Sequence, residues 1–323
     1  MGEFELIQRF FQDRSRPPAD EVPVGIGDDC AVIKPTPGAQ WLVSSDMLVE
    51  GRHFLSTVAP ERLGHKALAV NLSDLAACGA TPRAFTLALA LPRADAAWLE
   101  GFAHGLFALA DAHGIALVGG DTTAGPLNIC ITVMGEAPAG QALLRSGARA
   151  GDDLYVSGSL GDARLALEVF RGTVALERGA DFQQARRAME CPTPRVALGQ
   201  ALRGVASSAI DVSDGLLGDL GHVLERSGGL GATLLVDALP RSELLASLPL
   251  PLQRLCTLTG GDDYELVFTA PPEARDAVRA AAAASATPVT LIGRMEALPG
   301  RRLLDAQGRL LEWHEASFDH FKS

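Results

Sequence analysis

Apolar and polar residues follow two periods along this chain, and these periods predict strands that alternate with helices. Short apolar runs bounded by Gly, Asp and Ser are typical of strands, whereas apolar residues three and four positions apart are typical of helices. Pro60 and Gly79 mark the two ends of one such helix. The predicted strands are 30–34, 41–45, 84–91, 115–118, 128–135, 153–157, 208–212, 232–236, 264–269 and 288–293. The other predicted helices are 3–13 (with Phe4, Ile7, Phe10 and Phe11 on one side), 95–113, 162–171, 195–204, 215–227 and 272–284, and a hairpin-like tail follows the last strand.

This alternation predicts an α/β (α+β) fold in which helices cover sheets. At 323 residues the chain is long for a single core, so we expect two domains. The segment 136–152 is rich in Gly and Pro and is the best candidate for a linker. We therefore predict an N-terminal domain at 1–137 and a C-terminal domain at 138–323 that completes the active site.

The composition of the chain limits the kinds of molecule that it can bind and the compartment that suits it. A net charge of −11 argues against nucleic acid or an anionic membrane as partner. None of the three lysines lies in a P-loop motif, so metal ions would have to bridge a bound nucleotide to carboxylates. The five cysteines lack a C-x-x-C pair, which suits a reducing compartment. No apolar run approaches the ~20 residues of a membrane helix, and we expect a soluble, cytoplasmic protein.

Six short acidic turns recur along the chain, most of them directly after an apolar run. Any one of them is an ordinary use of Asp and Gly in a turn. Six together point to a site for several Mg²⁺ ions and a polyphosphate, because Mg²⁺ takes one or two carboxylates and completes its shell with water and phosphate oxygens. The turns are Gly25–Asp29, Ser44–Asp46, Asn71–Asp74, Gly119–Thr123, Asp211–Gly215 and Gly260–Asp263.

Within these turns the residues leave some alternatives open. Asn71 and Asp74 share a helix face, where they suit either a metal ion or a hydrogen bond to another helix. Gly119 and Gly120 allow main-chain N–H groups to approach a phosphate. Ser213 suits either a helix N-cap or a phosphate contact.

The ordered set of motifs resembles the thiamine-monophosphate kinase family, which belongs to the superfamily of aminoimidazole ribonucleotide synthetase. The motifs cover nearly the whole chain, and their order is more specific than any one of them. They are G-I-G-D-D-C-A, V-E-G-x-H-F at 49–54, K-A-L-A-V-N-L-S-D-L-A-A-x-G-A at 66–80, G-G-D-T-T, R-S-G-A at 145–148, I-D-x-S-D-G-L at 210–216 and G-G-x-D-Y-E-L at 260–266.

The resemblance implies a role for each of these residues. The implied ligands of several Mg²⁺ ions are Asp29, Ser44, Ser45, Asp46, Asp74, Asp121, Asp211 and Asp214. The implied ATP contacts are Gly120, Asp121, Arg145, Ser213 and His104, although a surface position suits Arg145 and His104 equally well. The implied substrate contacts are His53, Asp262 and Phe318, with Trp313 as an alternative to Phe318. Position 262 is usually Glu in the family, so Asp262 departs from its pattern.

The implied fold is the two-domain α/β (α+β) fold of aminoimidazole ribonucleotide synthetase, with mixed sheets covered by helices and with N-terminal sheets that join in a homodimer. The implied activity is ATP-dependent phosphorylation of thiamine monophosphate to thiamine diphosphate by direct in-line transfer. No general base is expected, because a phosphate monoester has a second pKa of about 6 and is already largely dianionic. The obstacle is the repulsion between two anions, which positioning and charge neutralisation overcome. The alternatives are a catalytically silent nucleotide- or thiamine-phosphate-binding protein and a sister enzyme of the superfamily.

Overall fold

The computed structural model describes residues 2–15, 17–18, 20–315 and 317–318. The chain divides into two compact units. Unit 1 contains Met1–Leu75 and Ala80–Gly140, and unit 2 contains Ala76–Gly79 and Gln141–Ser323. The division falls after Gly140, whereas the sequence places it after residue 137. In the described residues no helix is both long and apolar enough to cross a membrane.

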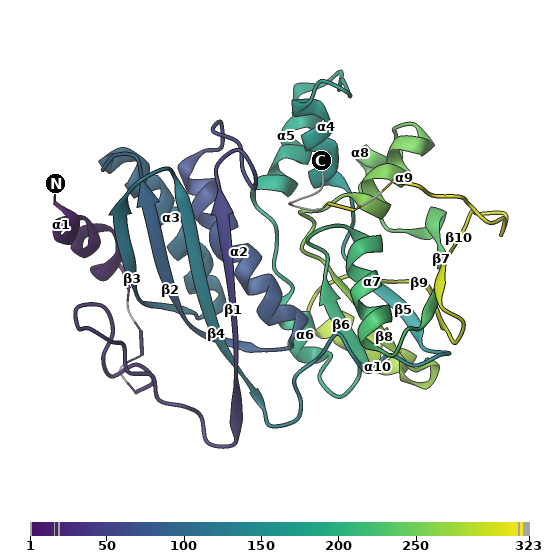
Figure 1. Ribbon diagram of the computed structural model, residues 1–323, viewed down its shortest axis with the longest axis horizontal. Coiled ribbons are helices and arrows are strands. Elements are labelled where there is room, and N and C mark those ends of the chain that lie inside the picture. The colour runs from purple at the N-terminus through teal and green to yellow at the C-terminus, as the bar shows by residue number, and fades with distance from the viewer. Residues whose placement is uncertain (1, 16, 19, 316, 319–323) are drawn as a thin grey trace. The chain divides into compact units, whose positions relative to one another are not determined.

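Unit 1 is built on a mixed sheet whose order in the described chain is β1-β4-β2-β3. Strands β1 and β2 each pair antiparallel with β4, and β3 pairs parallel with β2. Helices α2 (Pro60–Ala77) and α3 (Ala96–His113) lie on one face of this sheet (Figure 1). The strands are β1 Ala39–Val49, β2 Thr81–Leu91, β3 Ala116–Ala124 and β4 Asn128–Pro138.

Glycines bring helices α2 and α3 into backbone contact. A Cβ atom on Gly64 would lie 2.0 Å from the carbonyl oxygen of Phe102, and one on Gly105 would lie 1.8 Å from that of Glu61. No side chain fits at either position. The close packing fixes α2, the helix that carries Asn71 and Asp74.

Unit 2 contains a second mixed sheet with the order β10-β7-β9-β5-β8-β6 in the described chain. Only its edge pair β10–β7 is parallel. Its strands are β5 Asp153–Ser157, β6 Ser208–Asp211, β7 Gly231–Leu235, β8 Leu266–Ala270, β9 Val289–Glu296 and β10 Gly300–Leu304. Its helices are α4 Asp162–Phe170, α5 Gly179–Glu190, α6 Val196–Ala201, α7 Leu216–Arg226, α8 Glu243–Ala246, α9 Leu250–Thr259 and α10 Arg275–Ala284. Leu216, Leu220 and Val223 of α7 belong to the hydrophobic core of this unit.

The predicted α/β class with helices covering mixed sheets is confirmed, but two predicted turns are wrong. Ser44–Asp46 and Gly119–Thr123 lie inside β1 and β3 and do not follow them. Pairing with the neighbouring strand continues through both segments, from Ala39 opposite Pro138 to Val49 opposite Asn128 in the case of β1. The low strand propensity of Ser, Asp and Gly is overridden by this cross-strand pairing.

The structure differs from the predicted elements at three further places. The segment 30–34 is not a strand, and Val32 forms only an isolated bridge to Val24. Helices α5, α8 and α9 were not predicted. At the N-terminus, α1 (Glu3–Ile7) continues as a π-helical turn at Gln8–Gln12, which widens the helix. Phe10 and Phe11 are buried, whereas Phe4, which was predicted on the same side of the helix, is 83% exposed.

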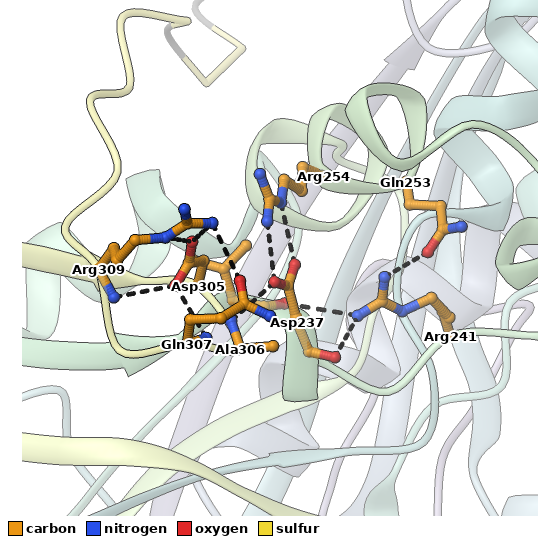
Figure 2. A network of polar contacts seen from close by, with 9 residues as sticks. Asp237, Arg241, Gln253, Arg254, Asp305, Ala306, Gln307 and Arg309 are labelled. Carbon is orange, nitrogen blue, oxygen red and sulfur yellow. Dashed lines mark hydrogen bonds and ion pairs between the residues drawn. The ribbon is translucent and has the colours of Figure 1, made fainter.

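A polar network fixes the predicted hairpin-like tail to the body of unit 2 (Figure 2). The Asp237 carboxylate accepts hydrogen bonds from Arg254 at 2.9 and 2.8 Å and from the main-chain N–H of Ala306 at 2.9 Å. Arg309 donates from Nε to Asp305 across the turn that follows β10, at 2.8 Å. The turn at 305–309 is therefore anchored to the end of β7 and to α9.

Candidate functional site

Strand β1 and helix α2 bring four of the predicted polar residues together. Ser44 and Asp46 lie on the same face of β1, because side chains alternate along a strand. The Ser44 hydroxyl donates to the carboxylate of Asp74. The main-chain N–H of Asp46 donates to Oδ1 of Asn71 at 3.1 Å. We call Ser44, Asp46, Asn71 and Asp74 the β1–α2 cluster.

Asn71 orients this cluster. Its side chain is 1% exposed, and its Nδ2 donates to the carbonyl oxygen of Ala67 at 3.0 Å. Both ends of the amide are thus held, with Oδ1 directed at β1. The hydrogen bond predicted as one alternative for Asn71 exists, but it joins a helix to a strand and not to another helix.

Ser45 and Asp121 lie on the opposite face of the sheet. The Ser45 hydroxyl contacts Oγ1 of Thr132 at 2.9 Å. Register places Met47 opposite Cys130, Cys130 opposite Ala88, and Ala88 opposite Asp121. Asp121 on β3 therefore lies three strand spacings from Met47 on β1, which is a distance of about 14 Å. The structure does not bring Asp121 to the β1–α2 cluster within one chain.

Gly120 packs against the neighbouring strand. Its φ is 149°, and a Cβ there would lie 1.9 Å from the carbonyl oxygen of Leu87. Only glycine fits this position, because the main chain of Leu87 lies against it. The predicted approach of main-chain N–H groups to a phosphate stays a prediction.

His53 follows β1 in a tight turn. Its Nδ1 accepts the N–H of Val49 at 2.9 Å, and its carbonyl oxygen accepts a hydrogen bond from the buried ammonium of Lys66 at 3.1 Å. A neutral ring that accepts at Nδ1 carries its proton on Nε2. His53 therefore presents a donor nitrogen at a fixed position.

Three other predicted residues lie at the surface. Asp29 is exposed in a loop, where its N–H donates to Asp28. His104 is exposed on α3, with Nδ1 3.1 Å from the carboxylate of Glu61. Arg145 is also exposed.

In unit 2 the turn between β6 and α7 is held by Asp219, a residue that the sequence analysis did not identify. Asp211 ends β6 and is 4% exposed. One oxygen of the Asp219 carboxylate, Oδ2, accepts three main-chain N–H groups, each at 3.1 Å. The donors are Ser213, Asp214 and Gly215. Burial, and next the charge of Asp214, raise the pKa of Asp219 to about 7, while the three N–H donors oppose this shift. An acid in the first turn of a helix, reaching back to preceding N–H groups, is the signal that identifies it.

The loop at 260–265 is joined to this turn by main-chain hydrogen bonds. Asp262 donates to Ser213, and Tyr264 donates to Val212, both at 2.8 Å. Asp262 has a φ of 66°, in the left-handed region where Asp is enriched several-fold. This backbone conformation is a physical reason for Asp at a position where Glu was expected.

Of the two candidate aromatic residues, Phe318 is exposed and hydrogen-bonded to the turn that carries Asp214, and Trp313 is not. The N–H of Phe318 donates to the carbonyl oxygen of Asp214 at 3.2 Å, and its side chain is 47% exposed. Trp313 packs against the hydrophobic core of unit 2.

The comparisons with known proteins agree with these two units. Residues 27–137 match the family described as AIR synthase related protein, N-terminal domain, and residues 149–305 match its C-terminal domain. A thiamine-monophosphate kinase from Salmonella typhimurium is 45% identical over 99% of this chain and 98% of its own length. The chain belongs to the thiamine-monophosphate kinase family.

Solved structures of this family have the same fold. The crystal structure of thiamine-monophosphate kinase from Stenotrophomonas maltophilia K279a is 46% identical, with a TM-score of 0.85 over 94% of this chain and 96% of that one. A structure described as AaThiL complexed with AMPPCP and TMP is 29% identical, with a TM-score of 0.76 over 99% of this chain and 97% of that one.

Proposed function

We propose that this chain transfers the terminal phosphoryl group of ATP to thiamine monophosphate, which yields thiamine diphosphate and ADP. The observation that carries this proposal is the β1–α2 cluster, found in a chain that belongs to a family of kinases for this substrate. The relative described as AaThiL complexed with AMPPCP and TMP supports the proposal. AMPPCP is an ATP analogue, and TMP is the usual abbreviation of thiamine monophosphate.

The reaction balances without a protein base. A phosphate oxygen of thiamine monophosphate forms a bond to the γ-phosphorus of ATP, and the bond from that phosphorus to the bridging oxygen of ADP breaks. Since the attacking phosphate is already largely dianionic, no proton has to be removed. What remains for the protein is to align the two anions in line and to neutralise their charge.

Mg²⁺ fits the donor set of the β1–α2 cluster. Carboxylate and hydroxyl oxygens are hard donors of the kind that Mg²⁺ takes, with water and phosphate oxygens completing its shell. Among the described residues no group of three or more His, Cys, Asp or Glu side chains could hold a metal ion. The proposal therefore requires the nucleotide phosphates and water to complete the shell of each ion. The proposed ligands are Asp29, Ser44, Ser45, Asp46, Asp74, Asp121, Asp211 and Asp214. Bound Mg²⁺ would supply positive charge to the phosphate oxygens.

The chain's own residues hold these donors in place. Asn71 fixes the main chain at Asp46, and Asp219 fixes the turn that carries Asp214. We assign nucleotide contacts to Gly120, Asp121, Arg145, Ser213 and His104. Their proposed role is to bind and orient ATP.

Three residues are proposed to bind the thiamine phosphate. The thiazolium ring is a permanent cation, so the exposed ring of Phe318 and the carboxylate of Asp262 both favour it. His53 presents Nε2–H as a donor for the phosphate. The substrate is thus recognised through charge at both of its ends.

A homodimer and a cytoplasmic location complete the proposal. The face of the unit 1 sheet opposite α2 and α3 carries exposed Trp41, Val43 and Met47 on the edge strand β1. A partner sheet that covers this apolar row would also bring a second set of site residues to the same face. The cofactors and substrates of the proposed reaction are small molecules of the cytoplasm.

An assay of ADP release tests the function. The full chain is supplied with ATP, excess Mg²⁺ and either thiamine monophosphate or free thiamine. We expect ADP release with thiamine monophosphate and a background rate with thiamine, which lacks the attacking phosphate. Binding of both ligands without ADP release would instead identify a silent binding protein.

A further inference from the structure

Helix α7 packs against the C-terminal segment of the chain through a glycine. A Cβ atom on Gly218 would lie 2.8 Å from Cβ and 2.9 Å from Oγ of Ser317. Rotation of the serine side chain moves Oγ away, but its Cβ is fixed to the backbone. Any side chain at position 218 therefore displaces the main chain at Ser317.

The same segment is held at two other points. Its start is fixed by the turn at 305–309 (Figure 2), and the N–H of Leu311 donates to the carbonyl oxygen of Leu303 at 2.8 Å. Leu311 and Trp313 then pack against the core of unit 2. At the far end of the segment, the main-chain N–H of Phe318 donates to the carbonyl oxygen of Asp214 at 3.2 Å. Ser317 lies between these anchors.

The contact at Gly218 is tight. Oγ of Ser317 is buried and has no hydrogen-bond partner in the described part of the chain. Packing on Gly218, and not a side-chain hydrogen bond, thus holds this residue against α7. The position of Phe318, one residue further, depends on that packing.

We propose that Gly218 is a positioning residue for substrate recognition: its lack of a side chain lets the C-terminal segment lie against α7 and sets Phe318 beside the Asp214 turn. This inference rests on the proposed function, because it takes Phe318 as the aromatic that meets the thiazolium. Gly218 itself touches no substrate. It acts through Ser317 and Phe318.

The chain offers a matched control on the same helix. A Cβ on Gly221 meets nothing within 4 Å. Both glycines lie inside α7, so Gly218→Ala and Gly221→Ala gain the same helix propensity, and the two variants differ in the contact with Ser317.

Steady-state kinetics and hydrogen–deuterium exchange of the full chain test the proposal. Gly218→Ala should raise KM for thiamine monophosphate by about 2- to 30-fold, the value of a cation–π contact, with KM for ATP unchanged. Amides at 311–318 should exchange faster in Gly218→Ala than in Gly221→Ala. The double variant Gly218→Ala, Ser317→Gly should regain the wild-type KM for thiamine monophosphate and the wild-type rate of amide exchange, because Ser317→Gly removes the clashing Cβ.

Identical kinetics and exchange in the two alanine variants would overturn the proposal, and so would a Gly218→Ala protein that fails to fold and is not rescued by Ser317→Gly. Failure of the proposed function gives a different result. In that case the wild-type chain shows no turnover, and the exchange comparison still decides whether Gly218 holds the segment.

Discussion

The main-chain N–H of Phe318 donates a hydrogen bond to the main-chain carbonyl oxygen of Asp214, at 3.2 Å. Asp214 is a proposed metal ligand through its side chain, and Phe318 is the proposed aromatic contact of the substrate. A single main-chain hydrogen bond thus joins the residue assigned to charge neutralisation to the residue assigned to substrate selection. Because Asp219 holds the Asp214 turn independently, we expect a displaced turn to move Phe318 but a displaced Phe318 to leave the turn in place.

Removing the aromatic ring should affect one substrate only. Phe318→Ala is expected to raise KM for thiamine monophosphate by about 2- to 30-fold and to leave KM for ATP almost unchanged, because a cation–π contact favours only the thiazolium. Initial-rate measurements with each substrate varied in turn provide the check. Equal losses for both substrates would show that Phe318 is structural, and Trp313 would become the next candidate.

Asp219 should matter for stability through its three accepted hydrogen bonds. Asp219→Ala leaves one buried and two partly buried main-chain N–H groups without their acceptor and should lower the free energy of unfolding by about 2–4 kcal/mol. Asp219→Asn retains one accepting oxygen, so its free energy of unfolding should fall by less than that of Asp219→Ala. Urea unfolding measures both. Equal stability of Asp219→Ala and the wild type would refute the role assigned to this side chain.

The exposed row on β1 should mediate association. Light scattering is expected to show a mass near twice the 33.8 kDa of one chain. Val43→Glu places a charge on that row and should produce monomers, whereas Leu298→Glu, at a 71% exposed position in unit 2, should not. A wild-type monomer across micromolar concentrations would contradict the proposed dimer.

The ion pair of Asp153 and Arg275 should make stability depend on pH. A hydrogen bond from Arg275 holds the pKa of the Asp153 carboxyl below its usual range, and burial opposes this shift. A lowered pKa stabilises the fold above the unfolded value of about 3.9, and the contribution is lost as pH falls through the folded value. Arg275→Met should therefore unfold at lower urea than the wild type at pH 7, and the difference should narrow as pH falls from about 4 to about 3.

Arg279 provides the control for this pair, because its ion pair with Asp276 is exposed on both sides. Arg279→Met should leave the urea midpoint unchanged at both pH values. If the urea midpoint of Arg275→Met fell short of the wild-type midpoint by the same amount at about pH 7 and about pH 3, Asp153 would not be the group responsible.

The sequence predicted the class of fold and most elements because apolar periodicity and end signals agree locally. Helix α3, for example, begins after the N-cap Asp95 and ends at Gly114 in the left-handed region. Helix α5 was missed because its buried positions, which include Ala185 and Met189, are few and its remaining surface is polar.

Which residues meet in space was less predictable. The i, i+3 spacing placed Asn71 and Asp74 on one helix face, but only pairing with β4 extends β1 far enough to set Ser44 and Asp46 opposite them. Cross-strand pairing is a long-range interaction that local propensity does not encode. Asp219 escaped notice for a similar reason, because its role depends on the path of the turn before it.

The most direct test of the central claim measures thiamine diphosphate formed from ATP and thiamine monophosphate as Mg²⁺ is raised above the ATP concentration. Asp46→Asn, Asp74→Asn and Asp214→Asn remove charge at nearly constant shape. We predict that wild-type turnover requires Mg²⁺ in excess of ATP and that each variant lowers kcat by about 100-fold or more, because a lost ligand misaligns the reacting oxygens. Near wild-type turnover by two of the three variants at low Mg²⁺ would contradict a metal site that these carboxylates share.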